Sequence, residues 1–264
     1  MKKLNILLIG GTKDASNITK HIKEKYDSYI LTTTTTEYGS KLAIESGSDD
    51  TIAKPLLKEE FITLIETNEF NLLIDATHPY ASHITQTTVS LSKLFNITYI
   101  RFERPPSNLD NVDTSRVHEV TSLDEAGKLI ASDFTSGNVL HLAGANTMET
   151  ILKYVQVNRF YARILKVPKS LEKCKLLNVP EEHIIEMKGT SSLEENLKII
   201  EETQASVIIT KESGDIGGVI NKINAANLKD IGVIMLKRPK IKDLNKKDIV
   251  SNLDELDEKI NNYF

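Results

Sequence analysis

The stretch LNILLIGGTKDASNITKHIKEK, from Leu4 to Lys25, contains the pattern that decides the fold. Its first six residues are mostly apolar and predict a buried strand, and the residues from Asp14 onward have the spacing of an amphipathic helix. Gly10-Gly11 lies between them, and glycine lets the backbone turn sharply and approach a ligand closely. A helix start offers free N–H groups and a favourable dipole to a phosphate. The stretch therefore predicts a strand, a glycine turn and a helix that together can hold a nucleotide.

The same alternation of short apolar runs and amphipathic stretches continues through most of the chain. Strands are expected at residues 4–9, 29–33, 72–75, 98–102, 138–143, 159–165, 206–210 and 232–236. Helices are expected at residues 14–25, 58–67, 82–95, 123–131, 147–155, 192–203, 218–228 and 253–262, whereas residues 166–182 are less regular. Continuous apolar strands that alternate with helices indicate parallel sheets covered on both faces. The expected fold class is α/β, with two Rossmann-like three-layer domains, mostly parallel sheets and a cleft between the domains.

The sequence RPPSN at residues 104–108 interrupts this alternation. Two prolines followed by polar residues are typical of a linker or crossing between domains. We expect a nucleotide-binding domain at residues 1–105, a substrate-binding α/β domain at 106–240 and a C-terminal tail with a helix at 241–264. The two halves show no clear sequence repeat. Ligands of such sheets bind at the carboxyl ends of the strands.

Composition and charge exclude several classes of protein. The chain has 264 residues, of which 40% are hydrophobic and 27% are charged, as in an ordinary globular protein. A net charge of −4 argues against a general nucleic-acid binder, which carries a basic excess. No apolar segment approaches the length of a membrane span, and the run at residues 6–9 is too short for a signal peptide. We therefore expect a cytoplasmic protein without a membrane or nucleic-acid partner.

The sequence predicts neither a disulfide nor a metal site. The single cysteine, Cys174, lies in the polar stretch EKCK, so we expect an exposed loop and an incidental thiol. One thiol can form no internal disulfide and has no partner for a cysteine-based zinc site. His78 and His83 are five residues apart, which differs from the i, i+4 spacing of a helical metal site.

The turn Gly10-Gly11-Thr12 is the first candidate for cofactor binding. It lacks the third glycine of the full dinucleotide fingerprint, so a plain strand-to-helix turn fits equally well. The second expected strand ends in a run of five threonines, where NAD enzymes usually carry an acidic residue that holds the ribose 2′-hydroxyl. The hydroxyls of Thr32 and Thr33 can bind a 2′-phosphate, which a carboxylate repels. The run favours NADPH and leaves NADH open, although the β propensity of threonine alone also accounts for it.

The most informative stretch is DATHPYA at residues 75–81, directly after an expected strand. Polar groups at the carboxyl end of a central strand lie at the mouth of the ligand cleft. We expect Thr77 and His78 to contact a nicotinamide or a substrate carboxylate, and Pro79 to start the next helix. Alternatively, Asp75 and Thr77 cap that helix, and His78 has no functional role.

These residues resemble the precorrin-6A reductases of cobalamin (vitamin B12) biosynthesis. The family begins with a Gly-Gly-Thr turn, and its most specific motif is Asp-Ala-Thr-His-Pro followed by Phe or Tyr and Ala, which residues 75–81 match in full. The resemblance spans residues 4–239, and it departs from the family pattern at Lys13 and Asp215, where members often carry Glu and Gly. The departures concern the cofactor turn and loop closure. Further motifs follow in the family's order at Arg101 to Pro105, Arg163-Ile164, Thr210 to Gly214, Lys222 with Ala225-Ala226, and Arg238-Pro239.

The resemblance implies reduction of one double bond of the precorrin-6A macrocycle, or of its cobalt form, to precorrin-6B, with NADPH as the usual hydride donor. This substrate carries many acetate and propionate groups, and arginine suits carboxylates because its planar fork binds two oxygens. Arg104 and Arg238, which lie beside prolines, also fit a role in joining the domains. Ser213 and Gly214 begin a glycine-rich segment that resembles a lid over the substrate. The basic residues that the motifs assign to the substrate carboxylates are Arg101, Arg104, Arg163, Lys211, Lys222 and Arg238.

Hydride transfer asks little of the side chains, because the cofactor supplies the hydride and the protein positions the reactants. A proton must also reach the neighbouring ring carbon. His78 and Tyr80 are the candidate catalytic donors, and solvent or a substrate carboxylate would also serve. The expected partners are the polycarboxylate tetrapyrrole and the next enzyme of the pathway, which would receive the product.

Three other classes of protein are alternatives on the sequence, and the first of them, another Rossmann-type oxidoreductase such as a short-chain dehydrogenase, is disfavoured. A short-chain dehydrogenase needs Tyr-x-x-x-Lys, but none of the eight tyrosines has a lysine four residues later. A non-catalytic nucleotide-binding or tetrapyrrole-binding protein would bind coenzyme without changing the spectrum of the tetrapyrrole. A methyltransferase of the same pathway would bind S-adenosylmethionine in place of a nicotinamide nucleotide.

Overall fold

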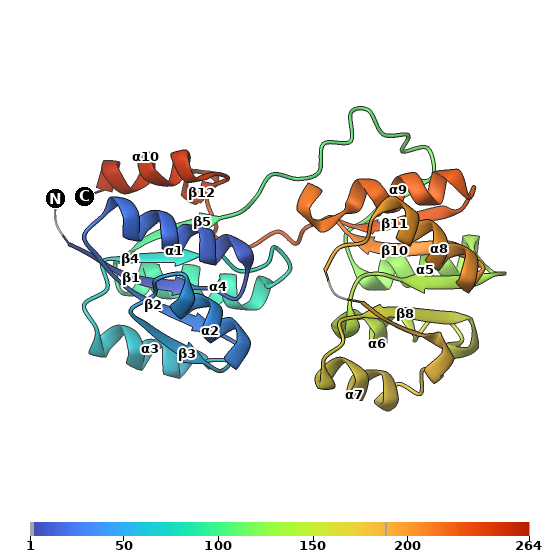
Figure 1. The fold of residues 1–264 in the computed structure, drawn as a ribbon, viewed down its shortest axis with the longest axis horizontal. Helices are drawn as coiled ribbons and strands as arrows, with labels where there is room; N and C mark the ends of the chain where they lie inside the picture. Colours follow the sequence, from blue (N-terminus) through green and yellow to red (C-terminus); the bar gives the residue numbers. More distant parts are fainter. Residues whose placement is uncertain (1–2, 188, 264) are drawn as a thin grey trace. The chain divides into compact units, whose positions relative to one another are not determined.

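The computed structural model describes residues 3–187 and 189–263, which form two compact units (Figure 1). One unit consists of Met1–Pro105 with Pro239–Phe264, and the other consists of Pro106–Arg238. The chain therefore leaves the first unit after Pro105 and returns to it at Pro239. We expected a separate tail at residues 241–264, but its described residues, up to Tyr263, fold with the first unit.

A six-stranded parallel sheet with the order β12-β5-β4-β1-β2-β3 forms the centre of the first unit. Its strands are β1 (Leu4–Ile9), β2 (Ser28–Thr34), β3 (Asp50–Ala53), β4 (Leu72–Asp75), β5 (Thr98–Phe102) and β12 (Ile249–Val250). Its helices are α1 (Lys13–Lys25), α2 (Glu37–Glu45), α3 (Lys58–Thr67), α4 (Ser82–Leu94) and α10 (Leu253–Tyr263). The strand order reverses between β1 and β4, which is the point where open α/β sheets bind ligands.

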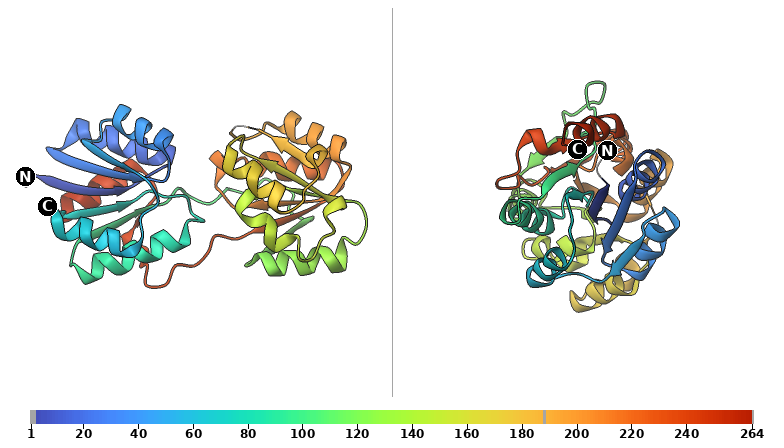
Figure 2. Two further views of the ribbon diagram at one scale, coloured as in Figure 1. Left: turned by 90° about the horizontal axis from the view of Figure 1, so that it is seen from below. Right: turned by 90° about the vertical axis from the view of Figure 1, so that its left-hand side faces the viewer.

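The central strands are apolar without alternation because helices cover both faces of the sheet (Figure 2). In β1, Leu8 packs in one buried cluster with Ile18 of α1. Its neighbour Leu7 faces the other way and packs in a second cluster with Phe61 of α3. Both strand residues are 1% exposed or less, as expected for a parallel sheet between two helical layers. The predicted α/β fold class with parallel sheets is thus confirmed.

The second unit has the same strand order, β6-β11-β10-β7-β8-β9, and its strand pairs are also parallel. Strands β7 to β11 occupy the places of β1 to β5. The remaining strand of each sheet lies at the equivalent edge, β12 beside β5 and β6 beside β11. The strands are β6 (Val117–Val120), β7 (Asn138–His141), β8 (Phe160–Ile164), β9 (Ile184–Glu186), β10 (Ala205–Lys211) and β11 (Gly232–Leu236). The helices are α5 (Leu123–Asp133), α6 (Met148–Ile151), α7 (Pro168–Leu176), α8 (Leu193–Thr203) and α9 (Val219–Leu228). The units repeat one topology without a sequence repeat.

The prediction of an exposed loop around Cys174 is wrong. Cys174 lies in α7, within the segment that we described as less regular, and its side chain is fully buried. Its neighbours Glu172 and Lys175 are exposed because they lie on the outer face of the same helix. Burial raises the pKa of the Cys174 thiol. The predicted helix at 147–155 is also too long, since α6 ends at Ile151 and begins after a 3-10 turn.

Candidate functional site

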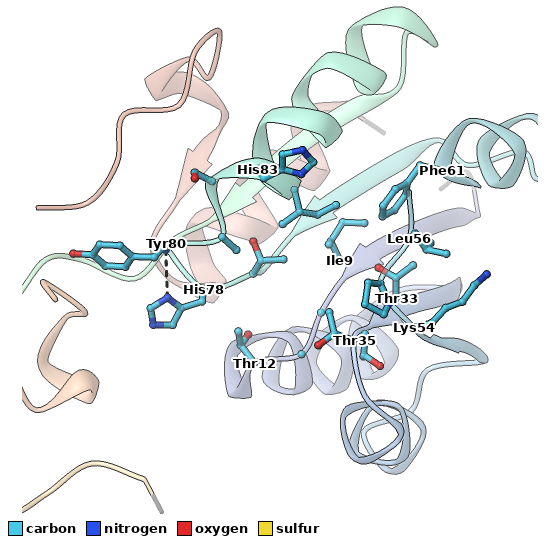
Figure 3. Close-up of a pocket in the computed structure, with 18 residues that line it drawn as sticks. Ile9, Thr12, Thr33, Thr35, Lys54, Leu56, Phe61, His78, Tyr80 and His83 are labelled. Atoms are coloured by element: carbon cyan, nitrogen blue, oxygen red, sulfur yellow. Dashed lines mark hydrogen bonds between the residues drawn. The ribbon is translucent and has the colours of Figure 1, made fainter. Parts of the chain in front are cut away.

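A pocket of about 480 Å³ lies at the carboxyl ends of β1, β2, β3 and β4 in the first unit (Figure 3). His78 and Tyr80 lie toward one end of it, and Leu56 and Phe61 lie toward the other (Figure 3). This is the place where an open α/β sheet binds a ligand. The lining residues are Ile9, Gly10, Gly11, Thr12, Thr33, Thr34, Thr35, Lys54, Pro55, Leu56, Phe61, Thr77, His78, Tyr80, Ala81, Ser82, His83 and Ile84.

The two glycines after β1 are needed for different reasons. A Cβ atom on Gly10 would come within 2.8 Å of the Thr32 Cγ2 atom, so this position has no room for a side chain. Gly11 has φ of +93°, which L side chains rarely adopt, and a Cβ there would meet no atom within 4 Å. The backbone at Gly11 is therefore open to a ligand, which fits a close approach by a phosphate.

Thr12 joins the β1 turn to the β4 turn. Its hydroxyl donates to the Ala76 carbonyl over 2.7 Å and accepts from the Ala15 N–H over 3.2 Å, which caps α1. The hydroxyl is thus used within the protein. A phosphate at this turn would instead meet backbone N–H groups at the start of α1. The acidic side chain in that first turn, Asp14, is paired with Arg104 over 2.6 Å.

The threonine run after β2 contributes unequally to the pocket. Thr33 lines it, whereas Thr32 does not, and the Thr32 hydroxyl is hydrogen-bonded to the Ser48 hydroxyl over 2.7 Å. Neighbouring residues of a strand point to opposite faces of the sheet, which accounts for the difference. Lys54 lies at the same pocket, where it follows β3, and it forms an ion pair with Glu60. Sequence reasoning missed Lys54 because β3 itself was not expected.

The turn after β4 is held by a buried carboxylate. Asp75 Oδ1 accepts from Arg101 Nη1 over 2.7 Å, from the Thr77 hydroxyl over 2.7 Å and from the Thr77 N–H over 2.9 Å. Asp75 Oδ2 accepts from the Tyr99 hydroxyl over 3.1 Å. Burial raises the pKa of Tyr99 well above its usual range, and the Asp75 charge adds to the effect. Arg101, expected at the substrate, thus lies beneath this turn and is 1% exposed.

His78 and Tyr80 lie together in the turn that follows. The Tyr80 N–H donates to His78 Nδ1 over 3.3 Å, and the two ring centroids are 5.7 Å apart (Figure 3). His78 is exposed, and both residues line the pocket. The prediction that Pro79 starts the next helix is wrong, because residues 78–81 form a turn closed by a bond from the Ala81 N–H to the His78 carbonyl. Helix α4 begins only at Ser82, so neither Asp75 nor Thr77 caps it.

The second unit gathers basic side chains at the carboxyl end of its own sheet. Arg163 lies in β8 and donates to the Ser191 hydroxyl, and Lys211 ends β10. Lys222 in α9 is 4% exposed and donates to the Gly217 carbonyl over 2.9 Å. The strand order places β10, β7 and β8 side by side, so Lys211 and Arg163 flank the end of β7.

Burial disfavours the charged forms of Arg163, Lys211 and Lys222. Burial and the positive charge of Arg163 together lower the pKa of Lys222 to about 8. Burial also lowers the pKa of Arg163 and of Lys211. Desolvated cations in like-charged company gain most from an added anion. The arrangement therefore favours a ligand with carboxylates.

His141, at the end of β7, is a further residue that the sequence did not single out. It is fully buried, and burial lowers its pKa to about 4, with the charge of Lys211 adding to the effect. Its Nε2 atom is 2.9 Å from the Thr147 hydroxyl. The neutral ring thus holds the glycine turn at Gly144, whose φ of +87° parallels that of Gly11 after β1.

The predicted lid and linker residues meet at one carboxylate. Glu212 Oε1 accepts from the Ser107 N–H and the Gly214 N–H, each over 2.9 Å, and Oε2 accepts from Arg238 Nε. These bonds and the Arg238 charge lower the pKa of Glu212 although its burial opposes the change. Ser213 packs so closely on Gly217 that a Cβ there would lie 1.8 Å from its hydroxyl. Glu212 thus links the predicted lid at Gly214 to Ser107 and Arg238, which lie near the two chain segments that connect the units.

The two units offer different chemistry to a ligand. The first has a glycine turn, hydroxyls and an elongated pocket, which suit a nucleotide. The second has a group of partly or fully buried cations, which suits a polyanion. The described residues include no cluster of three His, Cys, Asp or Glu side chains that could hold a metal ion, and none of their helices is long and apolar enough to cross a membrane.

Comparisons with known proteins find similarity along most of the chain. The family model described as precorrin-6x reductase CbiJ/CobK matches residues 5–261. The cobalt-precorrin-6A reductase of Methanothermobacter thermautotrophicus is 35% identical over 97% of this chain and 83% of its own length. That of Methanocaldococcus jannaschii is 36% identical over 90% of this chain and 92% of its own. The solved structure of CobK precorrin-6A reductase has a TM-score of 0.72 at 16% identity, covering 98% of this chain and 97% of that one, which shows a common fold.

Proposed function

This chain belongs to the precorrin-6x reductase family, and on that premise we propose that it transfers a hydride from NADPH to one double bond of cobalt-precorrin-6A. The observation that carries the proposal is the family match over residues 5–261, which takes in residues of both units. The reaction belongs to cobalamin biosynthesis and yields cobalt-precorrin-6B. We favour the cobalt form because the relatives at 35–36% identity carry that name, whereas the precorrin-6A reductase of a Sinorhizobium species is 23% identical.

The first unit supplies the coenzyme site in this proposal. When bound, the nicotinamide nucleotide provides the hydride. Gly11 and the start of α1 would hold its pyrophosphate, and the apolar end of the pocket at Leu56 and Phe61 would take the adenine. The turn with His78 would then adjoin the nicotinamide, which is the proposed role of that turn in cofactor binding.

NADPH is the coenzyme that the chemistry of this pocket supports. Among the described residues that line it, there is no Asp or Glu to hold a ribose 2′-hydroxyl and repel a 2′-phosphate. Thr33, Thr34 and Thr35 offer hydroxyls and backbone groups instead, and Lys54 adds a positive charge. Thr32 would contribute by shaping the turn, since its methyl group fills the space beside Gly10.

The second unit supplies the substrate site. We assign the acetate and propionate groups of the macrocycle to Arg163, Lys211 and Lys222, because their burial costs free energy that an anion would offset. The loop at Ser213 and Gly214 would close over the substrate. Contact of Arg104 or Arg238 with a carboxylate of the substrate stays a prediction, since each is paired with an acid of its own unit.

His78 and Tyr80 are the proposed proton donors, because both line the pocket in which the nicotinamide would lie. Either could protonate the ring carbon next to the one that receives the hydride. We place the reaction in the cytoplasm, as the sequence led us to expect, and propose that the product passes to the next enzyme of the pathway.

An anaerobic assay tests the proposal directly. The purified chain is mixed with NADPH or NADH and with cobalt-precorrin-6A or precorrin-6A, and the absorbance of coenzyme and tetrapyrrole is followed together. We expect oxidation of NADPH in equal amount with the spectral change of the cobalt substrate. Coenzyme binding without any change in either tetrapyrrole would contradict a catalytic function. Faster turnover with NADH would contradict the proposed reading of the threonine run.

A further inference from the structure

The buried ion pair beneath the β4 turn has a geometry that substrate binding does not explain. The Arg101 side chain is 2% exposed, and that of Asp75 is fully buried. Arg101 Nη1 donates to Asp75 Oδ1 over 2.7 Å and to the Thr77 hydroxyl over 2.9 Å, and Nε donates to Glu103 over 3.3 Å. Burial works against the charge, but the nearby acids raise the pKa of Arg101. The guanidinium is therefore charged, and its Nη1 and Nε atoms are hydrogen-bonded below the turn.

The Thr77 hydroxyl is engaged in the same way. It donates to Asp75 Oδ1 and accepts from Arg101 Nη1, and it lies 3.4 Å from the Thr85 hydroxyl. The Thr77 N–H also donates to Asp75. Thr77 nevertheless lines the nucleotide pocket. It can thus offer a ligand its methyl group and its backbone carbonyl, and its conformation is set by the carboxylate beneath it.

Tyr99 completes this arrangement from the other side. Its hydroxyl donates to Asp75 Oδ2, so side chains of β5 hold both oxygens of the carboxylate. Asp75 ends β4, and Tyr99 and Arg101 lie two residues apart in β5, which pairs with β4. Residues i and i+2 of a strand lie on the same face of a sheet, so both side chains reach one carboxylate. The strand register thus sets the place of the turn.

We propose that Arg101 and Tyr99 are positioning residues that act through Asp75 to hold the Thr77–His78 turn against the nicotinamide nucleotide, and that Arg101 does not bind substrate carboxylates. The inference rests on the proposed nucleotide site. It replaces the expectation, taken from the family motif, that Arg101 contacts the tetrapyrrole. Loss of the network is expected to loosen the turn and to weaken coenzyme binding and hydride transfer.

The test compares coenzyme affinity with substrate affinity in the full-length chain. NADPH dissociation constants come from fluorescence titration without tetrapyrrole, and kcat and KM for cobalt-precorrin-6A come from assays at saturating NADPH. We expect Arg101→Met to raise the NADPH dissociation constant about tenfold, as for the loss of one charge-assisted hydrogen bond, with a lower kcat. KM for the tetrapyrrole is expected to stay at the wild-type value. Tyr99→Phe, which keeps the ring, should show a smaller change in the same direction.

A second variant separates positioning from stability. Arg101→Met alone leaves a buried carboxylate without its cation, which can impair folding. The double variant Asp75→Asn with Arg101→Met removes both charges, so its unfolding midpoint should recover relative to that of the single variant. Its NADPH dissociation constant should stay raised, because the Thr77 hydroxyl still lacks its donor. The matched control is Arg116→Met, which removes an exposed ion pair with Asp230 and should change none of these quantities.

Three results would overturn the inference. The first is a raised tetrapyrrole KM in Arg101→Met with unchanged NADPH affinity, which would make Arg101 a substrate ligand. The second is recovery of NADPH affinity together with stability in the double variant, which would make the pair merely structural. The third is a wild-type chain that binds neither NADPH nor NADH. That result would also overturn the proposed function, and titration of the wild type alone distinguishes it from the first two.

Discussion

At Gly11, backbone geometry bears most directly on the proposed coenzyme site. Its φ of +93° disfavours any side chain, and the space around its Cα is open. We expect Gly11→Ala to lower the free energy of unfolding by about 1 kcal/mol, the usual cost of such a conformation. NADPH affinity should fall about tenfold or more, because the new methyl group occupies the approach of the phosphate. Urea unfolding and NADPH titration measure the two effects.

The control for this prediction is Gly47→Ala. Gly47 also has a positive φ, of +106°, and the nearest atom to its Cβ would be in the flexible Lys23 side chain at 3.3 Å. It lies outside the pocket residues and should lose similar stability without losing coenzyme affinity. Equal losses of NADPH affinity in the two variants would show that Gly11 has no special place at the phosphate.

Lys222 should make substrate binding depend on pH. Its pKa is lowered to about 8, so the free protein loses this positive charge as the pH rises through 8. Carboxylates bind the protonated form, so KM for the tetrapyrrole should rise above pH 8 by up to about tenfold per pH unit. Lys222→Met should have a high KM that no longer changes in this range. Lys229→Met, at the end of the same helix, is the control and should keep the wild-type dependence of KM on pH. If KM of Lys222→Met still rises above pH 8 as in the wild type, Lys222 is not the group responsible.

Single residues show what a strand pattern leaves undetermined. The sequence marked Thr32 and Thr33 as neighbours at one strand end, yet only Thr33 reaches the pocket. It marked Arg101 as a cation near the ligand, whereas the side chain is directed into the network around Asp75. In both cases the face to which a residue points depends on the packing of the next layer, which periodicity within one strand does not give.

At the scale of elements, the strands that we missed are the four edges of the two sheets. They are β12, β3, β6 and β9, and each has two to four residues. Central strands are buried on both faces and show continuous apolar runs, so they could be predicted. Edge strands are short and partly exposed, so hydrophobic pattern alone could not distinguish them from loops. Lys54 and the end of the pocket around it were missed for the same reason.

The C-terminal helix α10 is fastened to α1 by a single carboxylate. Asp257 accepts from His21 over 2.8 Å, from Lys25 over 2.6 Å and from Tyr26 over 2.9 Å. Its burial opposes ionisation, but these partners lower the pKa of Asp257. Burial, with the nearby Asp257 carboxylate adding to the effect, raises the pKa of Tyr26 to about 12. The element that returns from the second unit is thus fixed on the first.

Asp257→Asn should therefore destabilise the protein by about 1–3 kcal/mol at pH 7, because three donors lose a charged acceptor. The pKa of Asp257 is lowered by folding, so its stabilisation is present above the unfolded value of about 3.9 and is lost as the pH falls through the lower folded value. The difference in unfolding free energy between wild type and variant should shrink in that acidic range. Glu258→Ala, which changes an exposed residue of the same helix, should have little effect on the free energy of unfolding. An equal loss in Glu258→Ala and Asp257→Asn would show that the contact of Asp257 with α1 does not stabilise the protein.

At the scale of the molecule, one topology occurs twice, and we propose a different kind of site for each unit. Each sheet has a glycine turn after its first central strand, at Gly11 and at Gly144. Among the described residues of the second unit, burial lowers the pKa of the cations Arg163, Lys211 and Lys222, whereas the buried Arg101 of the first unit is paired with Asp75. The edge strand β12 of the first unit comes from the end of the chain, whereas the equivalent edge strand β6 of the second unit precedes the other five strands of its sheet. The sequence showed no repeat because hydrophobic packing, which both sheets share, allows many apolar residues at each position.

Division of labour between the units gives a prediction for paired variants. Arg163→Ala should raise the dissociation constant for the tetrapyrrole about tenfold and leave that for NADPH near the wild-type value. Gly11→Ala should do the reverse. Both constants can be measured by titration of the separate ligands. Loss of both affinities in Arg163→Ala would contradict the assignment of one ligand to each unit.

The central claim is that a hydride passes from a nicotinamide nucleotide to the macrocycle, and isotope transfer tests it most directly. The wild-type chain is incubated without oxygen with cobalt-precorrin-6A and NADPH that carries deuterium at both C4 positions of the nicotinamide. We expect the product of each turnover to gain one deuterium from the coenzyme and one hydrogen from water, as read by mass spectrometry. A reduced product without coenzyme deuterium, or no reduced product, would contradict it.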